Sequence, residues 1–208
     1  MYSEYNKRRK FFNERANTWL DTFYKDEKTG SYTKYHREFI RLFSLLNIQK
    51  SNIVLDAGCG CGILVPYILN DLGDKGHLYE LDYAEEMIKI NQRLHHDHRI
   101  SFLHTDIIDN PMKDGICDIV ICFACFPHLD NKIQGLQEMA RVLKKGGQLA
   151  IAHLNSSEEI NNHHRKCAEV MHDKLPVQKE MKALFDHAHL QIETFIDEPG
   201  FYYISGRK

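Results

Sequence analysis

The stretch Val54-Leu55-Asp56-Ala57-Gly58-Cys59-Gly60-Cys61-Gly62 decides the fold. It follows a short apolar run and precedes a segment with helical spacing of apolar residues, and in this context a glycine-rich loop indicates a ligand site. Glycine allows a tight turn and lets a ligand approach the backbone closely. The helix predicted for residues 62–72 would offer free N–H groups to an anionic part of that ligand.

Strand and helix patterns alternate after this loop. Short apolar runs that end at an acid or at glycines are typical of buried parallel strands, and a β-α repeat implies a parallel sheet with helices on both faces. Lysines followed by glycines at residues 144–147 suit the C-terminus of a helix. The predicted strands of this part are residues 53–55, 77–82, 100–104, 117–122 and 148–153, and the helices between them are residues 84–95 and 132–144.

Further elements are predicted on both sides of this repeat. Before it, residues 4–25 and 33–47 have the spacing of amphipathic helices. After it, helices are predicted for residues 156–172 and 178–188. The two last strand candidates, residues 190–196 and 201–206, lie close together in the sequence on either side of Pro199-Gly200 and suggest a hairpin at the sheet edge.

The composition is that of a globular protein. The chain has 208 residues, 43% apolar and 27% charged, with a formal net charge of -2, so no overall basic field attracts nucleic acid or anionic lipid. The polar, basic N-terminus predicts no signal peptide, and no apolar run approaches the roughly 18 residues of a membrane span. Six cysteines, several in strand-like runs, do not form a secreted disulfide framework. We therefore expect a cytoplasmic protein, monomeric or homodimeric, of one domain.

The glycine loop carries an acid two residues before its first glycine. The pattern D-x-G-x-G-x-G differs from the G-x-G-x-x-G of dinucleotide sites. S-adenosylmethionine (SAM) has an amino group and a carboxylate where a dinucleotide has a pyrophosphate, and a nearby carboxylate favours the ammonium and disfavours the pyrophosphate. We therefore predict SAM as the cofactor, with a nicotinamide cofactor as the weaker alternative and a plain packing turn as the third.

The chain resembles the class I SAM-dependent methyltransferases of the ubiquinone/menaquinone-biosynthesis-like type, most strongly over residues 52–153. The resemblance implies a Rossmann-like three-layer α/β/α sandwich, with a mostly parallel seven-stranded sheet of order 3-2-1-4-5-7-6 and an antiparallel C-terminal edge. We expect a single domain, residues 1–208. It would comprise an N-terminal helical cap (residues 1–50), a SAM-binding core (51–153), and substrate-side helices with a C-terminal hairpin (154–208).

The same resemblance implies the cofactor residues. Asp82, at the end of a strand, matches the acid that binds the SAM ribose, although it could also cap the next helix, and Glu80 is an alternative acid. Asp106 and the backbone of Ile107 match positions that bind the adenine, while Tyr83 and Met87 would pack near it. The full predicted set is Asp56, Ala57, Gly58, Cys59, Gly60, Gly62, Asp82, Tyr83, Met87, Thr105, Asp106, Ile107 and Phe123.

Two histidines are candidates for the catalytic base. Open α/β sheets bind ligands at the carboxyl ends of their strands, where His128 and His153 follow the fourth and fifth strands. A histidine titrates near neutral pH and could take a proton from the acceptor, or each could merely satisfy a loop hydrogen bond. The strand before His128 is not followed by N-P-P-Y or D-P-P-Y, which argues against methylation of adenine or glutamine amides.

Other polar segments are given less specific interpretations. The stretch 153–165 is interpreted as a substrate lid; Glu159 and His163, one helical turn apart, would be ligands if the segment bound a metal, but we expect no metal site. The aromatics of residues 11–19 resemble the family's entry segment and could line the substrate pocket or pack the helix on the sheet. The basic run 7–10 is interpreted as a solvated helix face, with contact to an RNA backbone as the alternative. The cysteines belong to the loop or to strands, which argues against arsenic chemistry.

The sequence therefore predicts an enzyme that transfers a methyl group from SAM to a small molecule and releases S-adenosylhomocysteine (SAH). A non-catalytic protein that binds SAM, SAH or a partner on the same fold is the alternative. The identity of the acceptor, and whether oxygen, nitrogen, sulfur or carbon is methylated, stay open because the fold does not determine them.

Overall fold

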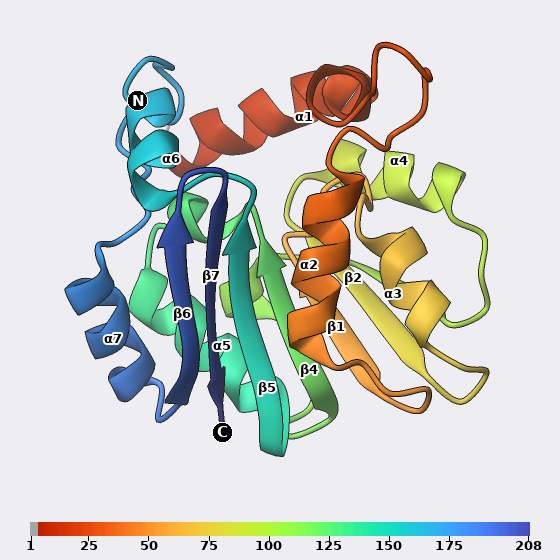
Figure 1. Cartoon of the computed structure of the whole chain (residues 1–208), viewed down its shortest axis with the longest axis vertical. Helices are drawn as coiled ribbons and strands as arrows, with labels where there is room; N and C mark the ends of the chain where they lie inside the picture. The colour runs from red at the N-terminus through yellow and green to blue at the C-terminus, as the bar shows by residue number, and fades with distance from the viewer. Residues whose placement is uncertain (1–3) are drawn as a thin grey trace.

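The computed structural model describes residues 4–208, and a seven-stranded sheet forms its middle layer (Figure 1). The strand order is β3-β2-β1-β4-β5-β7-β6, which confirms the predicted order and the Rossmann-like class. Strands β1 to β5 pair in parallel, and β7 runs antiparallel to both β5 and β6. The strands are β1 (Ile53–Ala57), β2 (His77–Asp82), β3 (Ile100–His104), β4 (Cys117–Phe123), β5 (Leu143–His153), β6 (Gln191–Glu198) and β7 (Phe201–Arg207).

Helices cover both faces of the sheet. The α-helices are α1 (Glu4–Phe23), α2 (His36–Leu46), α3 (Val65–Asp71), α4 (Glu85–Leu94), α5 (Lys132–Val142), α6 (Ser157–His164) and α7 (Gln178–His187). The short 3-10 helices are η1 (Ile107–Asp109) and η2 (Phe126–His128). None of the helices between residues 4 and 208 is long and apolar enough to span a membrane.

The alternation of side chains along each strand divides the core into two layers. On β4, Ile119 and Ile121 pack with residues of α1, α2, α3 and α4, whereas Val120 and Cys122 pack with residues of α5 and α7 on the opposite face. A strand with both faces buried is apolar throughout, which is why the sequence of β4 shows no polar alternation. The sheet therefore lies between two apolar layers.

Helix α1 lies across the carboxyl ends of the parallel strands, with α6 beside it (Figure 1). Its buried residues recur every fourth position, at Arg8, Phe12, Ala16 and Leu20. The first of these residues is an arginine, so the interpretation of residues 7–10 as a wholly solvated face is wrong. The carboxyl end of the sheet is thereby roofed by the N-terminal helix.

Two predicted helix boundaries near glycines are wrong. The helix predicted from residue 62 begins at Val65, because Gly62 has a φ of +80°, in the left-handed region that a helix does not use. The helix predicted to end at residue 144 ends at Val142, and the lysines and glycines that follow belong to β5. The turn within this strand is accommodated by Gly146, with a φ of +79°.

The helix predicted for residues 156–172 ends at His164. The cause is a set of side-chain hydrogen bonds that turn the chain back. The Asn161 side chain donates to the carbonyl of Leu175 and accepts from its N–H, at 3.0 and 2.9 Å, and the His164 ring contacts the carbonyl of Asp173 at 2.7 Å. Residues 165–177 therefore form an irregular segment that packs back on α6.

Candidate functional site

Three connected cavities lie at the carboxyl end of the sheet, beneath α1. The loop cavity contacts the glycine loop and has about 620 Å³ of empty space, and the Asp106 cavity beside it has about 570 Å³. The third cavity is on the side of α6, and we call it the aromatic cavity because Phe12, Trp19, Tyr24 and other aromatic side chains line it. His128 lines all three, so it marks the point at which they meet.

Asp82 lies at the junction of the loop cavity and the Asp106 cavity. Its carboxylate accepts hydrogen bonds from the backbone N–H of Gly60 at 2.9 Å and of Ala84 at 2.8 Å, and so ties the glycine loop to the start of α4. Burial raises the pKa of Asp82 to about 6, although these two hydrogen bonds oppose the rise. Each carboxylate oxygen has a second lone pair, which could accept a ribose hydroxyl.

Asp56 has no hydrogen-bond partner for its Oδ1 atom among residues 4–208, although the side chain is buried. Burial, and then the charge of Asp82, raise its pKa to about 8. An unpaired buried carboxylate is costly unless a cation or a donor reaches it. Because Asp56 lines the loop cavity, an ammonium group bound there would supply that partner. The position of the Asp56 carboxylate therefore fits the amino group of SAM.

The three glycines of the loop have different reasons to be glycine. All have positive φ, but a Cβ on Gly58 would lie 2.2 Å from the Cys125 sulfur, and a Cβ on Gly62 would lie 2.2 Å from the Asn91 side chain. A Cβ on Gly60 would meet only the sulfur of Met87, at 4.0 Å. Gly58 and Gly62 therefore permit close packing within the protein, whereas Gly60 lies against open space in the loop cavity.

Replacing Gly58 with alanine is expected to reduce the free energy of unfolding by about 2–5 kcal/mol, because the new methyl group would overlap the side chain of Cys125 in a strained backbone conformation. Gly60→Ala is the matched control. This variant introduces the same kind of backbone strain without a steric overlap, so it should reduce the free energy of unfolding by only about 1–2 kcal/mol. Urea denaturation followed by circular dichroism measures both. Equal losses in the two variants would contradict this account of Gly58.

The predicted cofactor residues divide into those that line a cavity and those that do not. Ala57 is core, Gly62 packs against α4, and the Thr105 hydroxyl contacts the carbonyl of Asp109 at 3.3 Å, so these three line neither cofactor-side cavity. The loop cavity is lined by Asp56, Gly58, Cys59, Gly60, Asp82, Tyr83, Met87 and Phe123, and the Asp106 cavity by Gly58, Asp82, Tyr83, Asp106 and Ile107.

Asp106 caps η1 by accepting a hydrogen bond from the N–H of Ile108 at 3.1 Å. Tyr5 of α1 reaches the same cavity, and burial together with a hydrogen bond to Asp106 raises the pKa of this tyrosine to about 12. Asp106 and the Ile107 backbone, at the start of η1 after β3, could bind the adenine of SAM on the far side of Asp82 from Asp56. Met87 lines the loop cavity but not the Asp106 cavity, so it does not share a cavity wall with Asp106 and Ile107.

The aromatic cavity shares a wall with the loop cavity, which includes Phe12, Phe123 and His128. Residues of α1 contribute much of its surface. Its aromatic side chains are Phe11, Phe12, Trp19, Phe23, Tyr24, Tyr35 and Phe123. Four histidines also line it: His128, His153, His163 and His164. This composition suits a flat, apolar molecule with a polar group.

His153 ends β5, is 5% exposed, and has no hydrogen-bond partner for Nε2 among residues 4–208. Burial, and then the charges of His128 and His164, lower its pKa to about 3. A histidine with that pKa is a weak base at neutral pH, although its neutral ring can hydrogen-bond a ligand. Of the two histidines that the sequence offers, the geometry therefore favours His128 for proton transfer.

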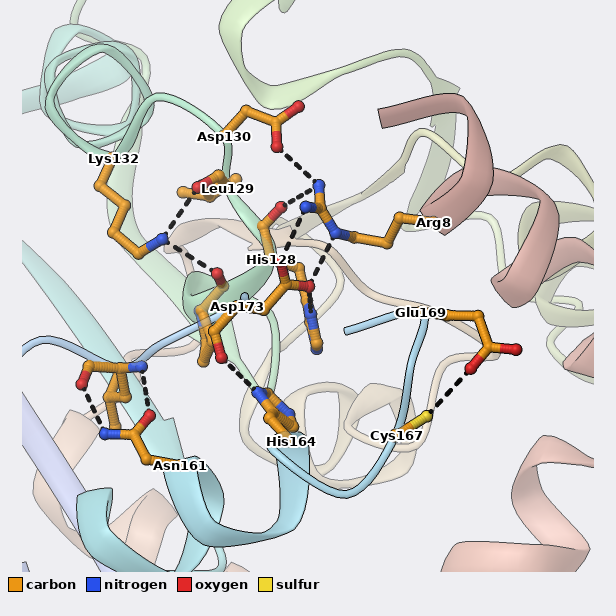
Figure 2. Close-up of polar contacts among 12 residues, drawn as sticks. Arg8, His128, Leu129, Asp130, Lys132, Asn161, His164, Cys167, Glu169 and Asp173 are labelled. Carbon is orange, nitrogen blue, oxygen red and sulfur yellow. Dashed lines mark hydrogen bonds and ion pairs between the residues drawn. The ribbon is translucent and has the colours of Figure 1, made fainter. Parts of the chain in front are cut away.

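His128 belongs to a buried polar cluster that the sequence did not predict (Figure 2). Its Nδ1 atom lies 2.7 Å from Oδ2 of Asp173, and Arg8 donates to both oxygens of the same carboxylate, each at 2.7 Å. Arg8 also donates to the His128 carbonyl at 2.9 Å. The spacing of Arg8 with the apolar residues of α1 was the signal for its burial, whereas no local pattern marked Asp173.

The metal alternative for residues 159 and 163 has no support from the geometry. The Glu159 carboxylate accepts from the N–H of Ser156 at 2.7 Å and of Gly200 at 2.9 Å, while His163 lines the aromatic cavity. In the part of the chain that the structure describes, no three His, Cys, Asp or Glu side chains are placed to hold a metal ion.

Comparison with known proteins gives one family match and several relatives. Residues 55–151 match the model of a methyltransferase domain. The demethylmenaquinone methyltransferase of Listeria welshimeri is 30% identical over 122 residues, 57% of this chain and 50% of that protein. The enzyme of the same name from Staphylococcus epidermidis is 26% identical over 145 residues, 69% of this chain and 54% of that protein. The chain thus spans about half the length of the curated relatives that it matches.

Solved structures share the fold at lower identity. A methyltransferase from Haloferax volcanii, solved in complex with the Trm112 methyltransferase activator, has a TM-score of 0.76 and 19% identity, with 94% of this chain and 96% of that chain covered. A SAM-dependent methyltransferase from Aquifex aeolicus has a TM-score of 0.72 and 18% identity, with coverage of 93% and 97%. The similarity in fold extends over nearly the whole chain.

Proposed function

We propose that the chain is a class I SAM-dependent methyltransferase that transfers a methyl group from SAM to a small aromatic acceptor, which the match of residues 55–151 to a methyltransferase domain supports. The observation that carries the proposal is the unpaired, buried carboxylate of Asp56 in a cavity that also contains Asp82. An ammonium and a pair of ribose hydroxyls would satisfy these two groups, whereas the pyrophosphate of a dinucleotide would find no cation at either of them.

We assign the donor to the loop and Asp106 cavities. Asp56 would pair with the amino group of SAM, Asp82 would accept from the ribose, and Asp106 with the Ile107 backbone would bind the adenine. Gly60 gives the backbone close approach to the cofactor. When bound, SAM supplies a methyl group on a sulfonium, which is a good leaving group.

We assign the acceptor to the aromatic cavity, which adjoins the loop cavity. Aromatic side chains of α1 and Phe123 would hold a flat ring and exclude water, and so place the reacting atom close to the methyl carbon. His128 would take a proton from the acceptor, and the neutral His153 would hydrogen-bond to it. The names of the bacterial relatives, which are demethylmenaquinone methyltransferases, support an acceptor of the quinol type.

We also propose how the chain is organised and where it acts. Residues 1–50 would serve as a cap, 51–153 as the SAM-binding core and 154–208 as the acceptor side of a single domain. All six cysteines are free thiols, which agrees with a reducing cytoplasm. We propose no nucleic-acid partner, because the net charge of -2 gives no overall attraction to phosphate.

Two measurements test the function. Calorimetry with SAM, SAH and NADH should detect binding of the first two only; binding of NADH alone would overturn the assignment of the cofactor. Incubation with methyl-labelled SAM and a panel of small aromatics that includes a soluble 1,4-naphthoquinol should then give a labelled product. A protein that binds SAM and labels none of the panel would support the non-catalytic alternative.

SAM binding is expected to release protons. In the free protein at pH 7 most Asp56 is protonated, since its raised pKa of about 8 lies above that pH, and pairing with an ammonium favours the carboxylate. Up to about one proton should leave per SAM bound. Calorimetry at pH 7 in phosphate and in Tris, which differ in ionisation enthalpy, measures this number. The Asp56→Asn variant should show much weaker binding with little proton release, whereas undiminished release in that variant would assign the protons to another group.

A further inference from the structure

We propose that Asp173 is a positioning residue that holds the His128 imidazole with its Nε2 atom free to act as the base, and that Arg8 holds Asp173 in place. This inference rests on the proposed methyltransferase function. It assigns a role to two residues that lie 165 positions apart in the sequence and meet at the one histidine that lines all three cavities.

The geometry of the cluster fixes the carboxylate of Asp173. Arg8 approaches with Nε and one terminal nitrogen, 2.7 Å from each carboxylate oxygen, which is a two-point contact of the kind that restricts orientation as well as distance (Figure 2). Both side chains are buried, at 7% and 5% exposed. The backbone carbonyl of Asp173 is bound in turn by the ring of His164. The carboxylate therefore has one orientation in which to meet His128.

The contact between Asp173 and His128 determines the tautomer of the ring. Burial alone would raise the pKa of Asp173, but hydrogen bonds from His128 and Arg8 outweigh burial and lower it, so the group is a carboxylate that can only accept. The Nδ1 atom, 2.7 Å away, must then carry the hydrogen. In the neutral ring the Nε2 atom is left with its lone pair, and no hydrogen bond to it forms among residues 4–208.

The ring itself is held from several sides. Phe12 of α1 packs edge-on at 5.1 Å between ring centroids, and His164 of α6 lies at 5.0 Å. The 3-10 helix that carries His128 is fastened by Lys132, whose ammonium donates to the carbonyls of Pro127 and Leu129 at 3.0 Å each. These contacts restrict rotation of the ring. Because Nδ1 is bonded to Asp173, Nε2 is the nitrogen left for the cavities.

Charged and titratable groups from five elements face the ring. Burial lowers the pKa of His128, Asp173 opposes this, and the cations of Arg8 and Lys132 add to the lowering. The full set is Arg8 from α1, Lys132 from α5, His153 from β5, His164 from α6 and Asp173 from the segment 165–177. At neutral pH the ring is therefore neutral and able to accept a proton.

The proposed transfer moves one proton and one methyl group. Nε2 of His128 takes the proton of an acceptor hydroxyl, and the electron pair left on oxygen, or delocalised onto a ring carbon, forms the bond to the methyl carbon. The bond between the methyl carbon and the sulfonium sulfur breaks, and its electron pair remains on sulfur. The products are the methylated acceptor, SAH and a protonated His128, which returns its proton to solvent. No oxidant or reductant is needed.

The tautomer can be measured without any acceptor. Two-bond ¹H–¹⁵N spectra of the ¹⁵N-labelled full chain, with SAH bound, distinguish the two neutral forms of histidine, and His128→Gln assigns the signals by their loss. We expect the Nδ1–H form in the parent protein. Asp173→Asn is expected to shift His128 towards the Nε2–H form, because an amide can donate to Nδ1. An Nε2–H ring in the parent protein would overturn the proposal even if Asp173→Asn does not fold.

The matched control is Asp130→Asn. Asp130 also pairs with Arg8, at 2.8 Å, but it is about half exposed, and it is Asp173 rather than Asp130 whose carboxylate bonds to the His128 ring. This variant should keep the Nδ1–H form, so a change of tautomer in both variants would assign the effect to Arg8 or to general loosening. SAH binding by calorimetry in the same samples separates failure of this proposal from failure of the proposed function, which predicts that binding.

Activity supplies a second readout. With labelled SAM and a soluble 1,4-naphthoquinol, Asp173→Asn should lower kcat by about 100-fold or more, the contribution of a well-placed base, with a much smaller change in the KM for SAM. Asp173 raises the pKa of His128, so its loss should also move the acidic limb of the kcat profile to lower pH, while Asp130→Asn keeps the parent limb. A reduced rate with an unmoved limb would mean that Asp173 acts only on packing, and would contradict the proposal.

Discussion

Replacement of Arg8 with alanine is expected to reduce the free energy of unfolding by about 3–5 kcal/mol, because it would leave the buried carboxylate of Asp173 without its cation. For a chain of this length the loss corresponds to a Tm lower by about 6–20 °C. The second ion pair of Arg8, with the half-exposed Asp130, adds little to this figure, since solvent screens it. Thermal unfolding followed by circular dichroism measures the change.

Lys7→Ala provides the control for this prediction. Lys7 is the neighbour of Arg8 in the same basic run, but it is exposed, and its ion-pair partner among residues 4–208 is exposed Glu4 at 2.7 Å. Its loss should change the free energy of unfolding by less than about 0.5 kcal/mol. If the two variants unfolded at the same temperature, the buried cluster would not contribute to stability as the geometry indicates.

Replacement of Asp82 is expected to weaken SAM binding strongly. Its replacement with alanine removes the acceptor of two backbone N–H groups and, in the proposed site, of the ribose hydroxyls. Hydrogen bonds to a charged group are worth about 1.5–3 kcal/mol each, so loss of the ribose contacts alone predicts SAM binding weaker by about 100-fold or more. Calorimetric titration with SAM gives the dissociation constant directly.

Glu80→Gln is the matched control on the same strand. Glu80 is also buried, but its Oε2 accepts from the Asn91 side chain at 2.6 Å and it lines none of the three cavities. Burial and the charge of Asp56 raise its pKa well above the ordinary value, and Gln replaces the carboxyl with a neutral amide of the same shape. SAM affinity should remain within a few-fold of the parent. A loss equal to that of Asp82→Ala would assign the effect to the acidic cluster as a whole.

Local chemistry explains why much of the fold was predictable. The run from Ile53 to Gly62 combines a buried strand with glycines that need positive φ, and such a combination has few structural solutions. The sheet order followed from a family resemblance rather than from spacing. The ends of helices were less predictable, since Gly62 delays α3 and the lysines after Val142 pair in β5 rather than closing a helix.

The parts of the site that sequence did not reveal depend on distant contacts. Asp173 belongs to an irregular segment whose shape is fixed by Asn161 and His164, so neither periodicity nor a motif marks it. Arg8 stands in a run of four basic residues, and only its position on the buried stripe of α1 separates it from its solvated neighbours. Sequence predicted His128 as a candidate, but the difference between it and His153 depends on partners and burial that the tertiary structure supplies.

The pairing of Arg8 with Asp173 has a consequence for the order in which the protein is made. The ribosome synthesises α1 first, and the carboxylate that neutralises Arg8 follows 165 residues later, after strands β1 to β5. A nascent chain that ends before Asp173 lacks the ion pair between Arg8 and Asp173. Its His128 imidazole also has no carboxylate to orient it. Because contacts between distant residues form late in folding, chemical competence would be among the last properties that the newly made chain acquires.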